Sequence, residues 1–106
     1  MSAAALLHEV HAEGVKLALT EHGTIEIRGQ ARAVAKWTPA VRQNKPQLID
    51  LLRLWRELEA AIRACCDARH DSAENREALL DDAWQSPEDW SWHVWYFTQE
   101  TAKWTH

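Results

Sequence analysis

The spacing of apolar residues near the start of the chain indicates a short amphipathic helix. Leu6, Leu7 and Val10 fall on one side of a helix over residues 3–13. Gly14 comes next, and glycine is the usual residue just past a helix end because it enters the left-handed backbone region without strain. We therefore expect the first helix to end at Gly14.

Apolar and polar residues alternate directly after this helix, in two short runs typical of half-buried strands. The apolar positions of the two runs are Val15, Leu17, Leu19, Ile25 and Ile27. His22 and Gly23 lie between the runs and supply the chemistry of a two-residue turn. Gly29 ends the second run. The pattern predicts an antiparallel hairpin.

Two prolines indicate where the next helices begin. Thr38 followed by Pro39 predicts a short helix after a loop over residues 30–36, with threonine as N-cap and proline in the first turn. Pro46 disfavours a helical residue before it and predicts the start of a longer helix. The wide apolar stripe of that helix consists of Leu48, Leu52, Trp55, Leu58 and Ile62.

The helical pattern breaks near residues 68–72, and two start signals follow. Asp71 to Glu74 fits a capping pattern before one helix, and Ser86 with Pro87 precedes a last helix. The apolar face expected for the last helix consists of Trp90, Val94, Phe97, Thr101 and Trp104. Trp92, Trp95 and Tyr96 lie off that face.

These elements predict an α+β fold, with the order α-β-β-α-α around a β-hairpin, followed by two C-terminal helices. The break divides the chain into a module over residues 1–70 and an acidic, tryptophan-rich extension over residues 71–106. We expect the extension either to complete the core of the module or to form a second contact surface.

The net charge of −4 is unevenly distributed along the chain. Residues 1–70 hold 10 basic and 8 acidic side chains, net +2, whereas residues 71–106 hold 2 basic and 8 acidic, net −6. The balance does not favour nucleic acid as a partner. The chain shows neither a secretory leader pattern nor an apolar run of membrane-spanning length. A cytoplasmic protein without a membrane partner is therefore expected.

No residue pattern indicates catalysis, a metal or a cofactor. His8 and His11 are spaced three apart on the first helix, but no second group of ligands accompanies them. The adjacent Cys65 and Cys66 point about 100° apart on a helix, so we interpret them as small buried residues. The sequence contains no phosphate-binding loop, nucleophile elbow or zinc-protease motif. We expect a non-enzymatic protein.

The stretches LLHEVHAEGVKLALTEHGTIEIRG and WTPAVRQNKPQLIDLL resemble the TubC-type N-terminal docking domain, over about residues 5–54. The resemblance implies a compact α-β-β-α-α module, often a homodimer, of nonribosomal peptide synthetase or polyketide synthase subunits. Such a module captures the short C-terminal tail of another subunit with its exposed hairpin. Residues 71–106 have no counterpart in this module. Similar stand-alone proteins occur in bacterial mobile elements near replication genes.

Two surfaces are candidate sites for a protein partner. The outward residues of the hairpin, which form either a docking face or an ordinary solvated face, are Lys16, Ala18, Thr20, Glu26 and Arg28. The aromatic residues that could support self-association or a second interface are Trp55, Trp90, Trp92, Trp95 and Tyr96. The sequence thus predicts a docking adaptor, and a homodimer. The alternative is a mobile-element accessory protein that acts with replication proteins or DNA.

Overall fold

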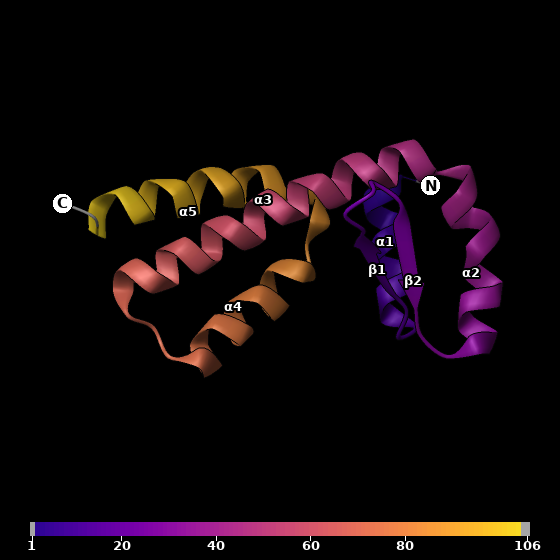
Figure 1. The fold of residues 1–106 in the computed structure, drawn as a ribbon, viewed down its shortest axis with the longest axis horizontal. Helices are drawn as coiled ribbons and strands as arrows, with labels where there is room; N and C mark the ends of the chain where they lie inside the picture. Colours follow the sequence, from indigo (N-terminus) through magenta and orange to yellow (C-terminus); the bar gives the residue numbers. More distant parts are fainter. Residues whose placement is uncertain (1, 105–106) are drawn as a thin grey trace. The chain divides into compact units, whose positions relative to one another are not determined.

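A helix, an antiparallel hairpin and four further helices follow one another in the structure, a computed structural model that describes residues 2–104. In chain order the elements are α1 (Ala3–Ala12), β1 (Lys16–Leu19), β2 (Ile25–Arg28), α2 (Ala31–Gln43), α3 (Lys45–Arg69), α4 (Ala73–Trp84), a 3₁₀ turn (Pro87–Asp89) and α5 (Trp90–Trp104), as Figure 1 shows. The predicted α+β class is confirmed. The chain forms two compact units, which divide between Arg53 and Leu54 within α3.

The junction between α1 and β1 is fixed by glycine, as predicted. Gly14 has a φ of 79°, and its N–H donates to the carbonyl of His11 at 2.9 Å. The N–H of Val15 donates to the carbonyl of Val10 at 3.1 Å, which completes a Schellman motif. Val10 and Val15 are both buried, so the motif directs the chain from the helix into the hairpin with an apolar contact in place.

The hairpin pairs Lys16 with Arg28 and Leu19 with Ile25, but its turn is longer than predicted. Three residues, 21–23, form the turn: the N–H of Gly23 donates to the carbonyl of Thr20 at 3.0 Å, and the N–H of Thr20 donates to that of Thr24 at 2.8 Å. A two-residue type I′ turn needs two residues with positive φ. A three-residue turn needs only one such residue, and Gly23, with a φ of 78°, is the one residue among 20–24 that has a positive φ.

The start of α2 at Ala31 corrects the prediction that residues 30–36 form a loop and that Thr38 caps a helix. Alanine-rich residues 31–35 favour a helix strongly enough that it begins about two turns before Pro39. Pro39 then lies inside the helix, where it has no N–H to donate. The hydroxyl of Thr38 donates to the carbonyl of Val34 at 2.6 Å, a local bond within the same turn.

Asn44 separates α2 from α3, so the predicted break before Pro46 is confirmed. Asn44 ends α2, and its carbonyl accepts from the N–H of Leu48 at 2.9 Å as α3 begins. Pro46 is the second residue of α3 rather than the first. The core of the first unit consists of Leu6, Leu7, Val10, Val15, Leu17, Val41, Leu48 and Leu52.

The second unit combines the later turns of α3 with α4 and α5. The sequence predicted a boundary near residues 68–72, where the structure has only a turn: His70, with a φ of 58°, ends α3. A capping pattern was predicted over residues 71–74, and within it Ser72 is the N-cap of α4, accepting a hydrogen bond from the N–H of Asn75. The core of this unit consists of Leu58, Ile62, Cys65, Cys66, Leu80, Ala83, Pro87, Trp90 and Phe97. Residues 71–104 therefore pack with the end of α3.

Trp90 is the largest fully buried side chain in the described residues. Its ring lies 5.0 Å from that of Trp55 and 5.3 Å from that of Trp84, centroid to centroid. Its indole N–H donates to the carbonyl of Ala83 at 2.8 Å, so the polar atom of the ring is satisfied in the core. This indole joins α3, α4 and α5.

Trp90→Phe is expected to lower the free energy of unfolding by about 2 kcal/mol, because it leaves a small void and removes a buried hydrogen bond. Urea unfolding followed by circular dichroism measures the loss. Trp92→Phe is the matched control, since Trp92 is 57% exposed in the same helix. Equal losses in the two variants would contradict the central role of Trp90.

Candidate functional site

The five outward hairpin residues lie together on one face, as predicted. Strand register places Lys16 opposite Arg28 and Ala18 opposite Glu26. Lys16, Ala18 and Arg28 are exposed, whereas Thr20 and Glu26 are half-buried. Two cations directly across a sheet repel each other, and the ion pair between Arg28 and Glu26 offsets part of that repulsion. The outward face is therefore small, polar and weakly cationic.

The opposite face of the hairpin is only partly covered. Leu17 on β1 is buried, but its cross-strand partner Ile27 is half-exposed, and so is Ile25. Both isoleucines line a hollow of about 210 Å³. The complete lining of the hollow is Thr24, Ile25, Ile27, Thr38, Val41, Arg42 and Lys45. The hairpin thus presents an open apolar surface where the sequence predicted core.

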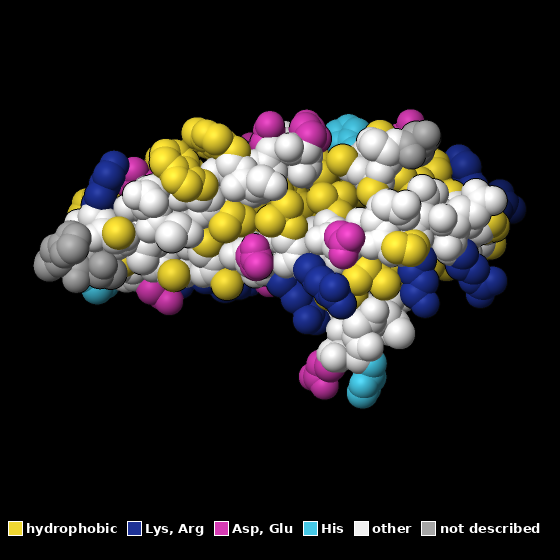
Figure 2. Space-filling view, turned by 90° about the horizontal axis from the view of Figure 1, so that it is seen from above, with side chains coloured by type: hydrophobic (Ala, Val, Ile, Leu, Met, Phe, Trp, Pro, Cys, Tyr) yellow, Lys and Arg dark blue, Asp and Glu magenta, His cyan; other side chains and the backbone are white. Residues whose placement is uncertain are grey.

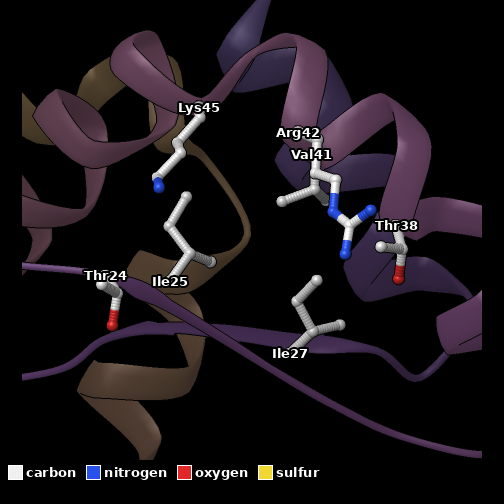
Figure 3. Close-up of a pocket in the computed structure, with 7 residues that line it drawn as sticks. All are labelled: Thr24, Ile25, Ile27, Thr38, Val41, Arg42 and Lys45. Carbon is white, nitrogen blue, oxygen red and sulfur yellow. The ribbon is translucent and has the colours of Figure 1, made fainter.

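Figure 3 shows how the lining side chains face one another. Ile25 and Ile27 rise from β2, Val41 and Arg42 reach toward them from α2, and Lys45 points its ammonium group toward Ile25 from the start of α3. Apolar side chains therefore form the floor of the hollow, and two cationic side chains stand at its rim.

The two rim cations are available to a ligand. Neither Arg42 nor Lys45 has a carboxylate within ion-pair distance among residues 2–104, and both are exposed. Lys36, by contrast, donates to the carboxylate of Glu13 at 2.9 Å, and this hydrogen bond lowers the pKa of Glu13. Lys36 joins α2 to the end of α1, whereas Arg42 and Lys45 have no such carboxylate partner in the described part of the chain.

The outer edge of β2 carries backbone groups directed away from β1. The hydrogen bond from Thr20 to Thr24 makes these two residues a bonded pair, and bonded and non-bonded pairs alternate along an antiparallel ladder. Ile25 and Ile27 consequently fall in non-bonded pairs. Their N–H and C=O groups point outward, beside the hollow.

The tryptophan candidates divide between core and surface. Trp90 is fully buried and Trp55 is half-buried against it, so both belong to the core of the second unit; the prediction that Trp90 contributes to an interface is wrong. Trp92, Trp95 and Tyr96 are exposed, as expected for residues off the buried face. Trp104 was predicted on the buried face, yet it is 57% exposed at the end of α5.

The histidine and cysteine candidates lie apart from the hollow. Cys65 and Cys66 are buried free thiols, as predicted, and burial raises the pKa of the Cys66 thiol. Within residues 2–104 no three His, Cys, Asp or Glu side chains are grouped closely enough to hold a metal ion. None of the described helices has both the length and the apolar composition that crossing a membrane requires.

The hollow was not predicted from the sequence, because its existence depends on the distance between α2 and the hairpin, which residue spacing does not give. Arg42 and Lys45 are spaced three residues apart on either side of the Asn44 junction. That spacing is the one signal that could have brought them together. Comparisons with family models, curated proteins and solved structures find no match to this chain.

Ile27→Ala is expected to lower the free energy of unfolding by about 1 kcal/mol, because Ile27 lines an open hollow and loses little burial. Leu17→Ala, at the cross-strand position, is expected to lower it by about 2–5 kcal/mol because Leu17 lies in the core. Parallel urea titrations of the two variants make the comparison. A loss at Ile27 as large as that at Leu17 would show that the hollow is part of the core.

Proposed function

We propose that this protein is a non-enzymatic docking adaptor whose hairpin binds an extended segment of a protein partner. The observation that carries the proposal is the outer edge of β2, which lies beside an open apolar hollow. Two cations stand at the rim of the hollow and have no ion-pair partner among residues 2–104. Strand addition to a sheet edge is a general mode of peptide recognition, in which backbone bonds give affinity and side-chain pockets give specificity.

The edge of β2 provides a short template for an added strand. Ile25 and Ile27 present outward N–H and C=O groups about 6.8 Å apart, the two-residue repeat of a strand. A partner segment of about four residues would satisfy these groups. Exposed edges of this kind also promote unwanted pairing.

The hollow determines which side chains the partner would carry. Its volume of about 210 Å³ is below the roughly 300 Å³ of small-molecule sites, but it accommodates one large apolar side chain. Side chains alternate between the two faces of a strand. The partner residue two positions after the one in the hollow would therefore face the hollow side of the hairpin as well. Carboxylates near either end would meet Arg42 or Lys45.

The outward face has a secondary role in this proposal. Alternate side chains of the added strand would lie on the outward face beside Glu26 and Arg28 of β2, so an acidic residue is favoured next to Arg28 and disfavoured next to Glu26. Rim charges of this kind influence association rate and partner choice more than affinity. The proposed partner is a short acidic and apolar segment, such as the C-terminal tail of a larger enzyme. This is the ligand class implied by the docking-domain resemblance.

Charge reversal at the rim tests the proposal. Peptides selected from a displayed random library on the full-length protein are expected to alternate apolar and acidic residues. Arg42→Glu combined with Lys45→Glu is expected to weaken their binding at least tenfold, since two attractive pairs become repulsive, about 1.4 kcal/mol or more in total. Fluorescence anisotropy with a labelled selected peptide measures the change.

Arg32→Glu is the matched control, because Arg32 is an exposed cation near the other end of α2. It is expected to change binding less than twofold. Amide resonances of Ile25 and Ile27 should shift on titration with the peptide. Binding that responds only to Lys16→Glu with Arg28→Glu would move the site to the outward face, and binding that responds to neither pair would refute hairpin docking.

A further inference from the structure

One helix carries every large apolar side chain that is exposed in residues 2–104. These side chains and their exposed fractions are Trp92 at 57%, Trp95 at 59%, Tyr96 at 37% and Trp104 at 57%, all on α5. Figure 2 shows hydrophobic side chains standing out from the surface over α5, at the left of the view. Concentrated exposed apolar area on a helix marks an interaction surface.

The aromatic face of α5 adjoins the face that packs in its own unit but is centred away from it. Each helical residue advances by about 100°, so Trp92 lies nearly opposite the buried Trp90, and Tyr96 lies about 100° from the buried Phe97. Trp92 stacks on Tyr96 with ring centroids 5.4 Å apart and planes inclined by 12°. The ring of Trp95 lies 6.5 Å from that of Trp92. These three rings form one continuous exposed surface. Tyr96 also contacts the core, since its ring lies edge-on to that of the buried Phe97 with centroids 5.2 Å apart.

The charges on this face are arranged so that the face complements itself. Glu88 precedes α5 by two residues. Lys103 lies near the other end of the helix, in line with Trp92 and Tyr96, and its ammonium group also donates to the carboxylate of Glu100 at 3.0 Å. An antiparallel copy of α5, with a two-fold axis between Trp95 and Tyr96, places Lys103 beside Glu88 of the second copy. The same operation repeats the pair at the other end, as isologous contacts require.

The size of the face and the charge of its unit also favour a second copy. The exposed parts of the three rings amount to roughly 350 Å², nearly half of the roughly 800 Å² that one partner buries in a standard interface. Flanking residues such as Gln99 supply more. Residues 54–106 hold 5 basic and 11 acidic side chains, net −6, which disfavours nucleic acid or an anionic membrane as the occupant.

We propose that α5 is a self-association helix, through which two copies of this chain pair antiparallel around Trp92, Trp95 and Tyr96. The rings form the apolar centre of the interface, and the pairs between Glu88 and Lys103 select the antiparallel arrangement. This inference is independent of the hairpin, because it involves no residue of the first unit.

Sedimentation velocity of the full-length protein between 1 and 100 µM tests the proposal. The natural sequence is expected to sediment as a dimer within this range. Trp92→Glu with Tyr96→Glu is expected to raise the dimer dissociation constant at least a hundredfold, because four carboxylates would enter the centre of the interface. Trp104→Glu is the control, because Trp104 is an exposed aromatic residue that lies off this face. It is expected to change the dimer dissociation constant by less than threefold. Circular dichroism confirms that each variant remains helical.

A charge exchange tests the arrangement of the two copies. Lys103→Glu alone is expected to weaken the dimer several-fold, and combination with Glu88→Lys is expected to recover most of the loss, because the pairs are then restored in reverse. A natural protein that is monomeric at 100 µM, or a dimer that survives Trp92→Glu with Tyr96→Glu, would overturn the proposal. If the protein dimerises but the variant with both Glu88→Lys and Lys103→Glu does not recover dimer affinity, the antiparallel pairing is overturned.

Discussion

The apolar stripe of α3 is the constraint on which the rest of the structure depends. Strands of four residues cannot form a stable hairpin alone, because two strands bury too little surface. Leu48 and Leu52 supply buried surface to the unit that contains the hairpin, and Leu58 and Ile62 do the same for the unit of α4 and α5. One helix of 25 residues thus contributes to both cores.

Local chemistry made most of the fold predictable from the sequence. Gly14, Ser72 and Pro87 each stop or start an element through backbone constraints that act over a few residues. Gly14 follows the first helix as expected and Ser72 lies within the predicted capping stretch, whereas Pro87 starts a 3₁₀ turn and the last helix begins only at Trp90. The errors arose where competing local effects had to be weighed. At Pro39 the loss of one helical hydrogen bond was outweighed by the helix propensity of the residues before it. At His22 the turn lengthened because Gly23 alone has a positive φ.

The candidate site was less predictable, since burial is a property of packing and not of spacing. Ile27 and Leu17 are equivalent in an alternating pattern, yet one lines an open hollow and the other is core. Trp90 and Trp92 are two positions apart in one helix, yet Trp90 is fully buried in the core and Trp92 is exposed on the surface. The hydrophobic period and the secondary-structure propensity of a segment show which face of a helix or strand each residue lies on. They do not show which neighbouring element covers that face.

The two proposed surfaces have different physical functions and become stronger in combination. A strand of about four residues added to β2 makes few backbone bonds, so a single hairpin is expected to bind its partner weakly. Pairing through α5 would give each assembly two hairpins, and a partner with two segments would then bind the second at a high effective concentration. The net charges of +2 and −6 on the two units would favour acidic segments at the unit that holds the hairpin over the unit that holds α5. The proposed self-association would therefore convert a short, weak template into a selective docking assembly.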